Sequence, residues 1–301
     1  MIETGNITDM IGVVILNYND VQTTIELVDK LVSYKSISNI VIVDNHSTDD
    51  SVQILNSKYK TITRIKIVIS NTNGGYGAGN NIGIKYLYDM YGIRYQIICN
   101  PDVSFEENVV VALLQGIKIL TKAAIVAPVM LDKNGKLCEK CVWRIPSVWE
   151  YIVFSLAYFS RFTNSFYYEQ SYFNKHEPWE VGCVAGSMFM IDVERLGTTT
   201  PYDERIFLYC EETVLGIKTM NLGYKSYVIP DRYFYHLHSV SIDKSIPKEI
   251  RRYKLMWDSR LYVLKTYMKA SFFQLMFAKI VKGLFLIEKQ MKLVVGGIEK
   301  W

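Results

Sequence analysis

The 301-residue sequence has no uninterrupted apolar run of the roughly 20 residues that a membrane-spanning helix needs. Its first ten residues are mixed polar, a composition that differs from a secretory signal. The five cysteines are odd in number and their spacing suggests no disulfide framework, which favours free thiols in a reducing cytoplasm. Because 50% of the residues are hydrophobic, the chain can bury a sizeable core, and we expect one large domain with an appendage.

Two common nucleotide-binding motifs are also missing. The glycine-rich stretch "NTNGGYGAGNN" (71–81) lacks the GxGxxG spacing and follows the third expected strand instead of the first, which argues against a dinucleotide-binding fingerprint. The sequence contains no GK[ST], so this stretch is not a P-loop. The single "CEKC" (138–141) has no second Cys or His pair nearby, which disfavours a zinc or redox site.

Net charge is small but unevenly placed. The whole chain carries +4, yet the segment from Lys244 onward holds 13 Lys and Arg against 4 Asp and Glu. The preceding 243 residues hold 21 against 26. A basic tail on a near-neutral or acidic body suggests an anionic partner for the tail, either nucleic acid or membrane head groups.

Apolar runs alternate with helical patterns through the first third of the chain. We expect buried strands at 11–19, 39–45, 65–70 and 95–100, separated by helices. Strands that are apolar throughout indicate a parallel sheet covered on both faces, and ligands bind beyond the carboxyl ends of such strands. Each expected strand ends in polar residues, which are Asn17, Asn19, Asp44, Asn45, Asn71, Asn73, Asn100 and Asp102. The sequence therefore predicts an α/β fold with one polar edge.

Asp102 follows the fourth strand directly. Asp is a favoured helix N-cap, but Ser104 with Glu107 three residues later forms a better capping box. Asp102 would then be free on the loop, with its direction fixed by Pro101. A carboxylate offered in this way suits a hard divalent cation such as Mg²⁺ or Mn²⁺.

The later part of the chain offers a second set of polar candidates. Glu211 and Glu212 lie on a helix expected over 207–223, and because neighbours on a helix point about 100° apart, at most one should face a given site. The alternative is a solvated helix start, where acids favour the helix dipole. His236 and His238 share one face of an expected strand, as metal ligands or as ordinary surface histidines. Strands are also expected at 184–191, 225–230 and 233–239.

The ordered motifs "VVILNYN", "IVIVDNHSTDDS", "NTNGGYGAGNNIGI", "NPDV", "VAGSMFMI", "FLYCEETVLGIK" and "HLHSVS" together resemble glycosyltransferase family 2. The resemblance runs from about Val13 to about Ser241 and is closest to the rhamnosyltransferase-like branch. It implies a GT-A, Rossmann-like catalytic domain over residues 1–243, with basic amphipathic helices over residues 244–301. It also implies an inverting, metal-dependent transferase that uses a nucleotide-sugar donor.

The resemblance implies a role for each matching residue. The nucleotide would contact Asn17, Asn19, Asp44, Asn73, Gly75 and Asn100; Asp102 and His236 would hold Mg²⁺ or Mn²⁺ on the diphosphate; and Glu212, beside Glu211, would be the base. Asn100 stands where the family usually has a first acid, which leaves one anionic ligand fewer. Glu212 stands where the family usually has Asp.

The expected reaction is transfer of L-rhamnose from dTDP-rhamnose to a glycan or lipid-linked acceptor in the cytoplasm, during synthesis of a bacterial cell-surface polysaccharide. A UDP-hexose donor is the alternative. A nucleotidylyltransferase would need a basic glycine-rich loop after the first strand, which "NYNDVQTT" does not supply. A non-enzymatic nucleic-acid binder would use the basic tail instead, and we expect no nucleic-acid partner.

The tail carries an apolar stripe at helical spacing, formed by Phe273, Met276, Phe277, Ile280, Leu284, Ile287 and Met291. The lysines on the other side are Lys279, Lys282, Lys289 and Lys292. Such a helix is typical of one that lies on an anionic membrane surface, as a peripheral protein on the inner face of the cytoplasmic membrane would. The same stripe could instead pack on the catalytic domain or on a second subunit in a homodimer. Removal of residues 270–301 is expected to abolish liposome binding and to preserve activity on a soluble acceptor.

Overall fold

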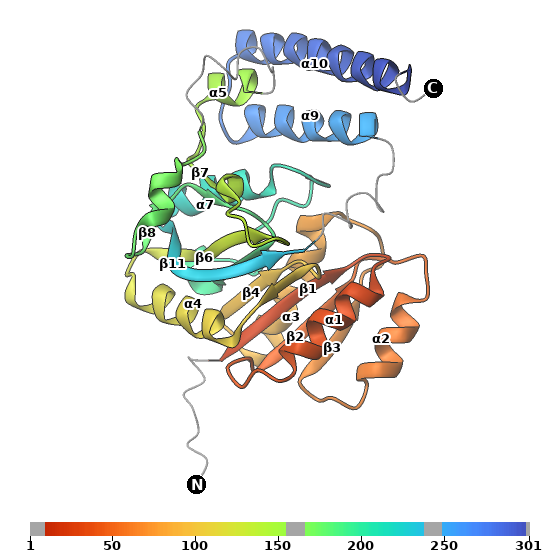
Figure 1. Cartoon of the computed structure of the whole chain (residues 1–301), viewed down its shortest axis with the longest axis vertical. Coiled ribbons are helices and arrows are strands. Elements are labelled where there is room, and N and C mark those ends of the chain that lie inside the picture. Colours follow the sequence, from red (N-terminus) through yellow and green to blue (C-terminus); the bar gives the residue numbers. More distant parts are fainter. Residues whose placement is uncertain (1–9, 155–165, 238–248, 299–301) are drawn as a thin grey trace.

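The computed structural model describes residues 10–154, 166–237 and 249–298, and the side chains of the last helix up to residue 291. A twisted sheet runs through the body of the molecule, and a pair of helices stands at one end of it (Figure 1). His238, which the sequence pairs with His236, lies outside the described residues.

Strands and helices alternate over the first half of the chain. The elements are β1 (Ile11–Asn17), α1 (Val21–Leu31), β2 (Asn39–Asp44), α2 (Ser51–Tyr59), β3 (Ile65–Ile69), α3 (Tyr76–Tyr91), β4 (Tyr95–Cys99), β5 (Val103–Phe105), α4 (Glu107–Ile119) and β6 (Ala123–Asp132). The second half contains β7 (Val142–Trp143), α5 (Val148–Val153), β8 (Trp179–Val181), β9 (Cys183–Val184), β10 (Met188–Asp192), α6 (Val193–Leu196), α7 (Glu211–Asn221), β11 (Lys225–His236), α9 (Glu249–Thr266) and α10 (Phe272–Ile298).

The strand order of the main sheet is β3-β2-β1-β4-β10-β6-β11-β5, with β8 paired to β11. Strands β1 to β4 are parallel, as the apolar runs predicted, and β6 pairs parallel with β11. Strand β10 runs antiparallel to both β4 and β6. Because β10 is reversed, the residues that precede it lie at the same edge as the carboxyl ends of β1 and β4.

Both faces of the sheet are covered by apolar side chains. Along β1, Val13 and Ile15 belong to a core that includes residues of α1, α2 and α4, while Val14 belongs to a second core with residues of α3 and α7. This alternation follows from the period of two in a strand. It explains why the parallel strands are rich in apolar residues that point to both faces.

Two local predictions were wrong. The Ser104–Glu107 capping box does not form, because residues 103–105 pair with β11 as β5, and α4 begins only at Glu107. The Ser104 hydroxyl instead accepts a hydrogen bond from Lys30, and the Glu107 carboxylate accepts one from the Ser36 amide. The two late strands expected from the sequence are one strand, β11, with a register shift between Ile229 and Tyr233.

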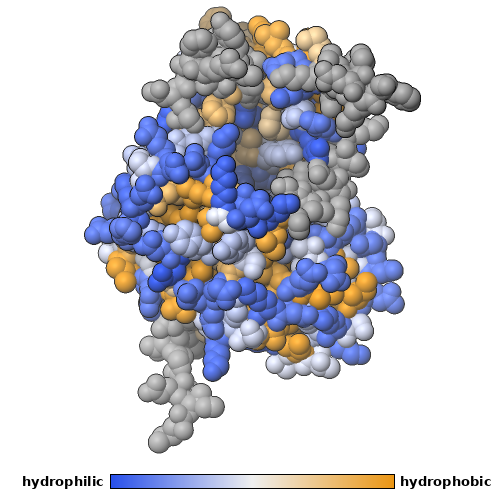
Figure 2. Space-filling view, viewed as in Figure 1, coloured by the Kyte–Doolittle hydropathy of each residue, from blue (hydrophilic) through white to orange (hydrophobic). Residues whose placement is uncertain are grey.

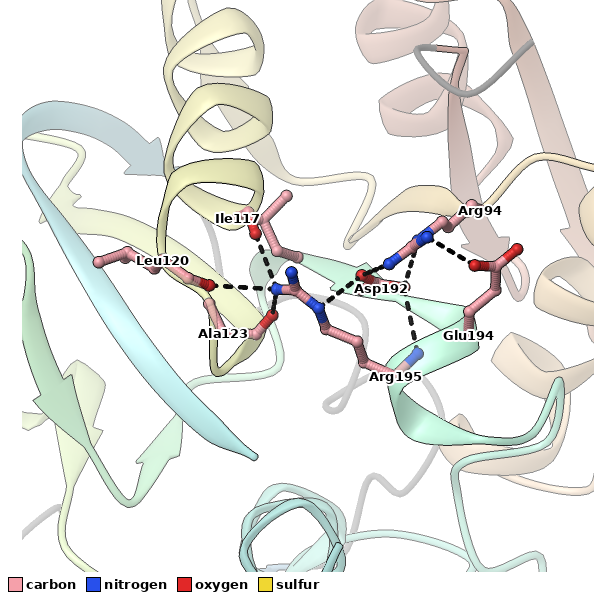
Figure 3. Close-up of polar contacts among 7 residues, drawn as sticks. All are labelled: Arg94, Ile117, Leu120, Ala123, Asp192, Glu194 and Arg195. Carbon is pink, nitrogen blue, oxygen red and sulfur yellow. Dashed lines mark hydrogen bonds and ion pairs between the residues drawn. The ribbon is translucent and has the colours of Figure 1, made fainter. Parts of the chain in front are cut away.

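A buried ion cluster fixes the end of the sheet opposite to the carboxyl ends of β1 and β4. Asp192, fully buried, accepts hydrogen bonds from the guanidinium of Arg94 at 2.8 and 2.6 Å (Figure 3). Arg195 contacts the same carboxylate and donates to the carbonyl groups of Ile117 and Leu120 at the end of α4 and of Ala123 at the start of β6. Cationic donors at a helix C-terminus satisfy its last carbonyls, so this cluster holds α4 against β10.

Helices α9 and α10 pack on each other and on α5 (Figure 1). Their shared core contains Trp257 and Val263 of α9 and Val281 of α10, together with Tyr151 of α5. Among the described helices, none combines the length and the hydropathy that crossing a membrane would require.

Candidate active site

A cavity of about 340 Å³ opens beyond the carboxyl ends of β1 and β4. Its lining includes the sequence-predicted residues Asn73, Gly75, Asn100, Glu211, Glu212 and His236. Asn17, Asn19, Asp44 and Asp102 lie outside the lining. Of the polar residues predicted at the strand ends, Asn45, Asn73 and Asn100 therefore line the cavity.

Asn17 and Asp44 lie beneath the cavity, where both are fully buried. The Asn17 amide donates to Asp44 Oδ1 at 2.8 Å, and Asp44 Oδ2 accepts the Ser47 amide at 2.9 Å. Asn19, with a φ of 51°, accepts the Thr48 amide at 2.8 Å. The three polar residues thus fix the loop after β2, and in this arrangement Asp44 presents no oxygen to the cavity.

The loop before α3 is held by a second amide network. Asn45 donates to the Asn73 side chain at 3.0 Å and to the Gly75 carbonyl at 3.1 Å. Gly75 has a φ of 89°, and a Cβ atom placed there would lie 2.0 Å from the Phe207 carbonyl oxygen. That oxygen accepts the Tyr76 amide at 3.0 Å. Gly75 thus lets two segments of the chain approach each other closely.

Asp102 and His236 meet at one side of the cavity. Because β5 pairs with β11, His236 stands opposite Val103, and its Nε2 lies 3.3 Å from Asp102 Oδ2. Asp102 is 2% exposed, so it is not free on a loop as expected, and its buried Oδ1 has no hydrogen-bond partner among the described residues. Asn100 lines the cavity beside them, and its backbone amide donates to the Ser187 carbonyl at 2.9 Å.

Glu211 and Glu212 begin α7 at another side of the cavity. Tyr209 and Cys210, with φ of 72° and 73°, turn the chain into the helix through the left-handed region that non-glycine residues rarely adopt. Both residues contribute to the lining of the cavity, whereas their 100° offset predicted that at most one would face a given site.

The two carboxyl groups are perturbed by their surroundings. Burial raises the pKa of Glu211 well above its ordinary value, and the nearby Glu212 charge raises this pKa further. Burial also raises the pKa of Glu212, whose Oε1 accepts the Gly186 amide at 3.3 Å. Because two close carboxylates resist double ionisation, the pair holds a proton at higher pH than an isolated glutamate would.

The turn between β9 and β10 is a part of the site that the sequence did not reveal. The Tyr76 hydroxyl donates to the Gly186 carbonyl at 2.5 Å, and the backbone amide of the same glycine donates to Glu212 Oε1. A Cβ atom at Gly186 would lie 2.9 Å from Glu212 Oε1. The segment 184–191 was expected to be one strand, but "AGS" (185–187) forms a turn that lines the cavity. The only sequence signal for this turn is the group of three small residues, 185–187, near the start of the apolar run.

The remaining wall comes from the segment before α7. Phe207, Leu208 and Tyr209 line the cavity, and the Leu208 carbonyl accepts the Ser259 hydroxyl of α9 at 2.7 Å. The helical end of the molecule is thus hydrogen-bonded directly to the wall of the site.

The architecture is GT-A-like, an α/β fold with a mostly parallel central sheet followed by C-terminal helices. Two solved structures share this fold. GalNAc-T7, solved with UDP, GalNAc and Mn²⁺, aligns with a TM-score of 0.57 at 15% identity, over 95% of this chain and 57% of its own. Staphylococcus aureus TarS (residues 1–349) aligns with a TM-score of 0.50 at 14% identity, over 85% of this chain and 72% of its own.

The family model described as "Glycosyl transferase family 2" matches residues 12–194, more than half of the sequence. The chain therefore belongs to glycosyl transferase family 2, as its motifs indicated. It is 26% identical over 217 residues to N-acetylglucosaminyl-diphospho-decaprenol L-rhamnosyltransferase of Mycobacterium tuberculosis, covering 68% of each chain. It is also 26% identical over 127 residues to the low-salt glycan biosynthesis hexosyltransferase Agl10 of Haloferax volcanii, covering 42% of this chain and 38% of that one.

Proposed function

We propose that this glycosyltransferase moves L-rhamnose from dTDP-rhamnose to a hydroxyl group of a lipid-linked glycan in bacterial cell-surface polysaccharide synthesis, with inversion at the anomeric carbon. The rhamnosyltransferase relative, which aligns over two thirds of both chains, supports transfer of L-rhamnose to a lipid-linked acceptor. The hexosyltransferase relative, which aligns over a shorter segment, favours a second candidate, transfer of a hexose, for which we propose a UDP-linked donor.

The observation that carries the proposal is the placement of Glu212 and the Asp102–His236 pair around one cavity. Transfer from a nucleotide-sugar has two requirements at different points of the site. The departing diphosphate must be stabilised, and a proton must be removed from the acceptor hydroxyl. Glu212 is suited to take that proton, because its raised pKa lies nearer to neutral pH than the pKa of an ordinary glutamate. A single direct displacement then inverts the anomeric centre.

Glu211 and Glu212 compete for one negative charge, because two close carboxylates resist double ionisation. Because the pKa of Glu211 is raised well above its ordinary value, we infer that it stays protonated while Glu212 is ionised. A neutral Glu211 leaves a single negative charge at the start of α7, where the helix dipole favours it. The Gly186 amide holds one oxygen of Glu212, so the other oxygen is left to receive the proton.

The residues around Asp102 fit a divalent cation such as Mg²⁺ or Mn²⁺. Its buried Oδ1 has no hydrogen-bond partner among the described residues, which an oxygen ligand awaiting a cation would explain. Asp102 and His236 would hold the cation with oxygens of the donor diphosphate, since the described residues contain no group of three or more His, Cys, Asp or Glu arranged around a metal. The bound cation would neutralise negative charge on the leaving diphosphate.

A donor panel tests the proposal. We expect the protein to hydrolyse dTDP-rhamnose slowly in the presence of Mg²⁺ or Mn²⁺, and faster than UDP-glucose, UDP-GalNAc or GDP-mannose. Glu139→Gln, which changes an exposed carboxylate away from the cavity, is the control variant. Preference for a UDP-hexose would select the second candidate, and failure to bind or turn over any of these donors would contradict both.

A further inference from the structure

One face of α10 exposes large apolar side chains along most of the helix. The apolar face of α10 consists of Phe272, Phe273, Met276, Phe277, Ile280, Leu284, Ile287 and Met291, each between 40% and 81% exposed. This set contains the whole stripe predicted from the sequence. Figure 2 shows hydrophobic residues at the upper end of the molecule, where α10 lies in Figure 1.

The other face of α10 makes the internal contacts. Ala278, Val281 and Phe285 are buried in the core shared with α9. Of the lysines assigned to that side, Lys282 contacts Asp258 at 2.5 Å, and Lys289 lies 5.4 Å from the ring centre of Tyr253. The alternative prediction that the stripe packs on the catalytic domain is therefore wrong, because α10 packs through a different set of residues. Rotation of the helix to bury the stripe would expose this second set.

Helix α5 extends the apolar face of α10. Trp149 is 52% exposed, and its ring contacts the ring of Phe277 edge to face at 5.7 Å. With Phe272 and Phe273 at the start of α10, the exposed surface is rich in aromatic rings. Aromatic rings, and Trp above all, concentrate at the boundary between water and the lipid bilayer.

Charge and length indicate the occupant of this surface. From Phe273 to Met291 the apolar positions recur on every turn over about 27 Å, at 1.5 Å per residue. The apolar face of α10 contains no charged side chain within these described residues, and exposed Lys279 lies at its border. The segment from Lys244 onward carries 13 basic against 4 acidic residues, which matches an anionic surface. A broad apolar face on a basic helix is the pattern of helices that lie in the head-group layer.

We propose that the apolar face of α10, together with Trp149, docks the protein on the head-group layer of an anionic lipid bilayer. Docking itself does not depend on the reaction catalysed. Its consequence for the active site rests on the proposed function, because only a lipid-linked acceptor would be concentrated at the same surface. A second copy of this chain is the competing occupant, and vesicle binding together with the oligomeric state distinguishes it from a bilayer.

Helix α9 joins the docking surface to the cavity. Tyr262 and Tyr267 each donate a hydroxyl to Asp203 Oδ2 at 2.7 Å, and Ser259 donates to the Leu208 carbonyl. Leu208 lines the cavity, and Asp203 lies in the chain segment that leads to this wall. Docking would therefore hold this wall at a fixed position relative to the bilayer, as an enzyme with a lipid-linked acceptor requires.

The test is co-sedimentation of the full-length protein with vesicles of phosphatidylglycerol and phosphatidylcholine. The variant Ile280→Gln/Leu284→Gln/Ile287→Gln changes three side chains that are at least 55% exposed, so its folding should be unaffected. We expect it to partition at least about tenfold less than the wild type, because each apolar side chain of this size contributes about that factor when buried. Donor hydrolysis should be unchanged. Point substitutions are preferable to removal of residues 270–301, which would also uncover Trp257.

A matched control changes three equally exposed apolar side chains elsewhere, Met90→Gln/Ile119→Gln/Met220→Gln, and should partition like the wild type. Vesicles of phosphatidylcholine alone should recover less protein than the anionic vesicles. Equal partitioning of the wild type and the α10 variant would overturn the proposal. Sedimentation analysis offers a second contradicting outcome. The proposal would be overturned if the wild type is a dimer and the α10 variant is a monomer while both bind vesicles equally.

Discussion

His236 Nε2 lies 3.3 Å from Asp102 Oδ2, although the two residues belong to segments far apart in the sequence. Antiparallel pairing of β5 with β11 brings them together, and the Asp102 carbonyl accepts the Leu237 amide at 2.8 Å next to this contact. The pairing leaves Asp102 Oδ1 buried and without a hydrogen-bond partner in the described part of the chain. A backbone register thus positions the two side chains proposed to bind a cation.

Asp102→Asn should lower sugar transfer on the order of 10²-fold, because it removes the anionic ligand while keeping the side-chain shape. Calorimetric titration of Mn²⁺ in the presence of the donor should show weaker metal binding, and thermal unfolding should change little. Asp89→Asn, which changes an exposed carboxylate paired with Lys85, is the control. Unchanged metal dependence in Asp102→Asn would assign the ligand role to another residue.

Glu212→Gln should lower turnover by roughly 10²–10⁴-fold, the usual contribution of a general base, with little change in donor affinity. The wild-type rate should rise with pH, because Glu212 must lose its proton before it can accept another. As the pKa of Glu212 is raised, that rise should lie at higher pH than for an ordinary glutamate. A pH–rate profile measures this directly. If Glu211→Gln is the more damaging variant, the wrong neighbour has been assigned as the base.

Glu211→Gln should make stability less sensitive to pH. The folded-state pKa of Glu211 lies above its unfolded value, so its contribution to stability is fully present below the unfolded pKa and is lost as pH rises through the folded pKa. A glutamine does not titrate and escapes this loss. The stability of the variant relative to the wild type should therefore increase between pH 5 and pH 8, measured by thermal or urea unfolding. A constant difference over this range would show that Glu211 ionises normally in the folded protein.

Much of the site could be predicted because it depends on local patterns. Apolar runs determine the parallel strands, and polar residues such as Asn73 and Asn100 follow them in sequence, so their place at the cavity follows from strand direction alone. The acidic pair at Glu211 likewise begins a helix that a local pattern reveals. These features need no knowledge of distant contacts.

Features that depend on long-range pairing could not be predicted. The contact of Tyr76 with Gly186 joins distant segments, and neither residue carries a signal that points to the other. Ser104 has the spacing of a capping box, but pairing of β5 with β11 satisfies its backbone as a strand. Asp44 ends its strand like the other edge residues, yet Asn17 and Ser47 engage its carboxylate below the cavity.

Gly75→Ala should destabilise the protein more than a change at an ordinary left-handed glycine. An ordinary left-handed conformation costs an alanine roughly 1 kcal/mol. Gly75, with φ 89° and ψ −174°, lies in a region that essentially only glycine adopts, and the added Cβ would also collide with the Phe207 carbonyl. Gly135→Ala is the matched control, because Gly135 has a φ of 78° with open space around it. Urea unfolding should give a loss of about 1 kcal/mol for the control and a clearly larger loss for Gly75→Ala. Equal losses would mean that the 73–76 loop can move away from Phe207.

The most direct test of the central claim follows the anomeric configuration during sugar transfer from dTDP-rhamnose to a soluble acceptor analogue, using proton NMR. The wild type should release dTDP and form a product of inverted configuration. The Glu212→Gln variant should form this product at a rate that is lower by a factor of roughly 10² or more. A product of retained configuration, or a Glu212→Gln variant as fast as the wild type, would contradict the account.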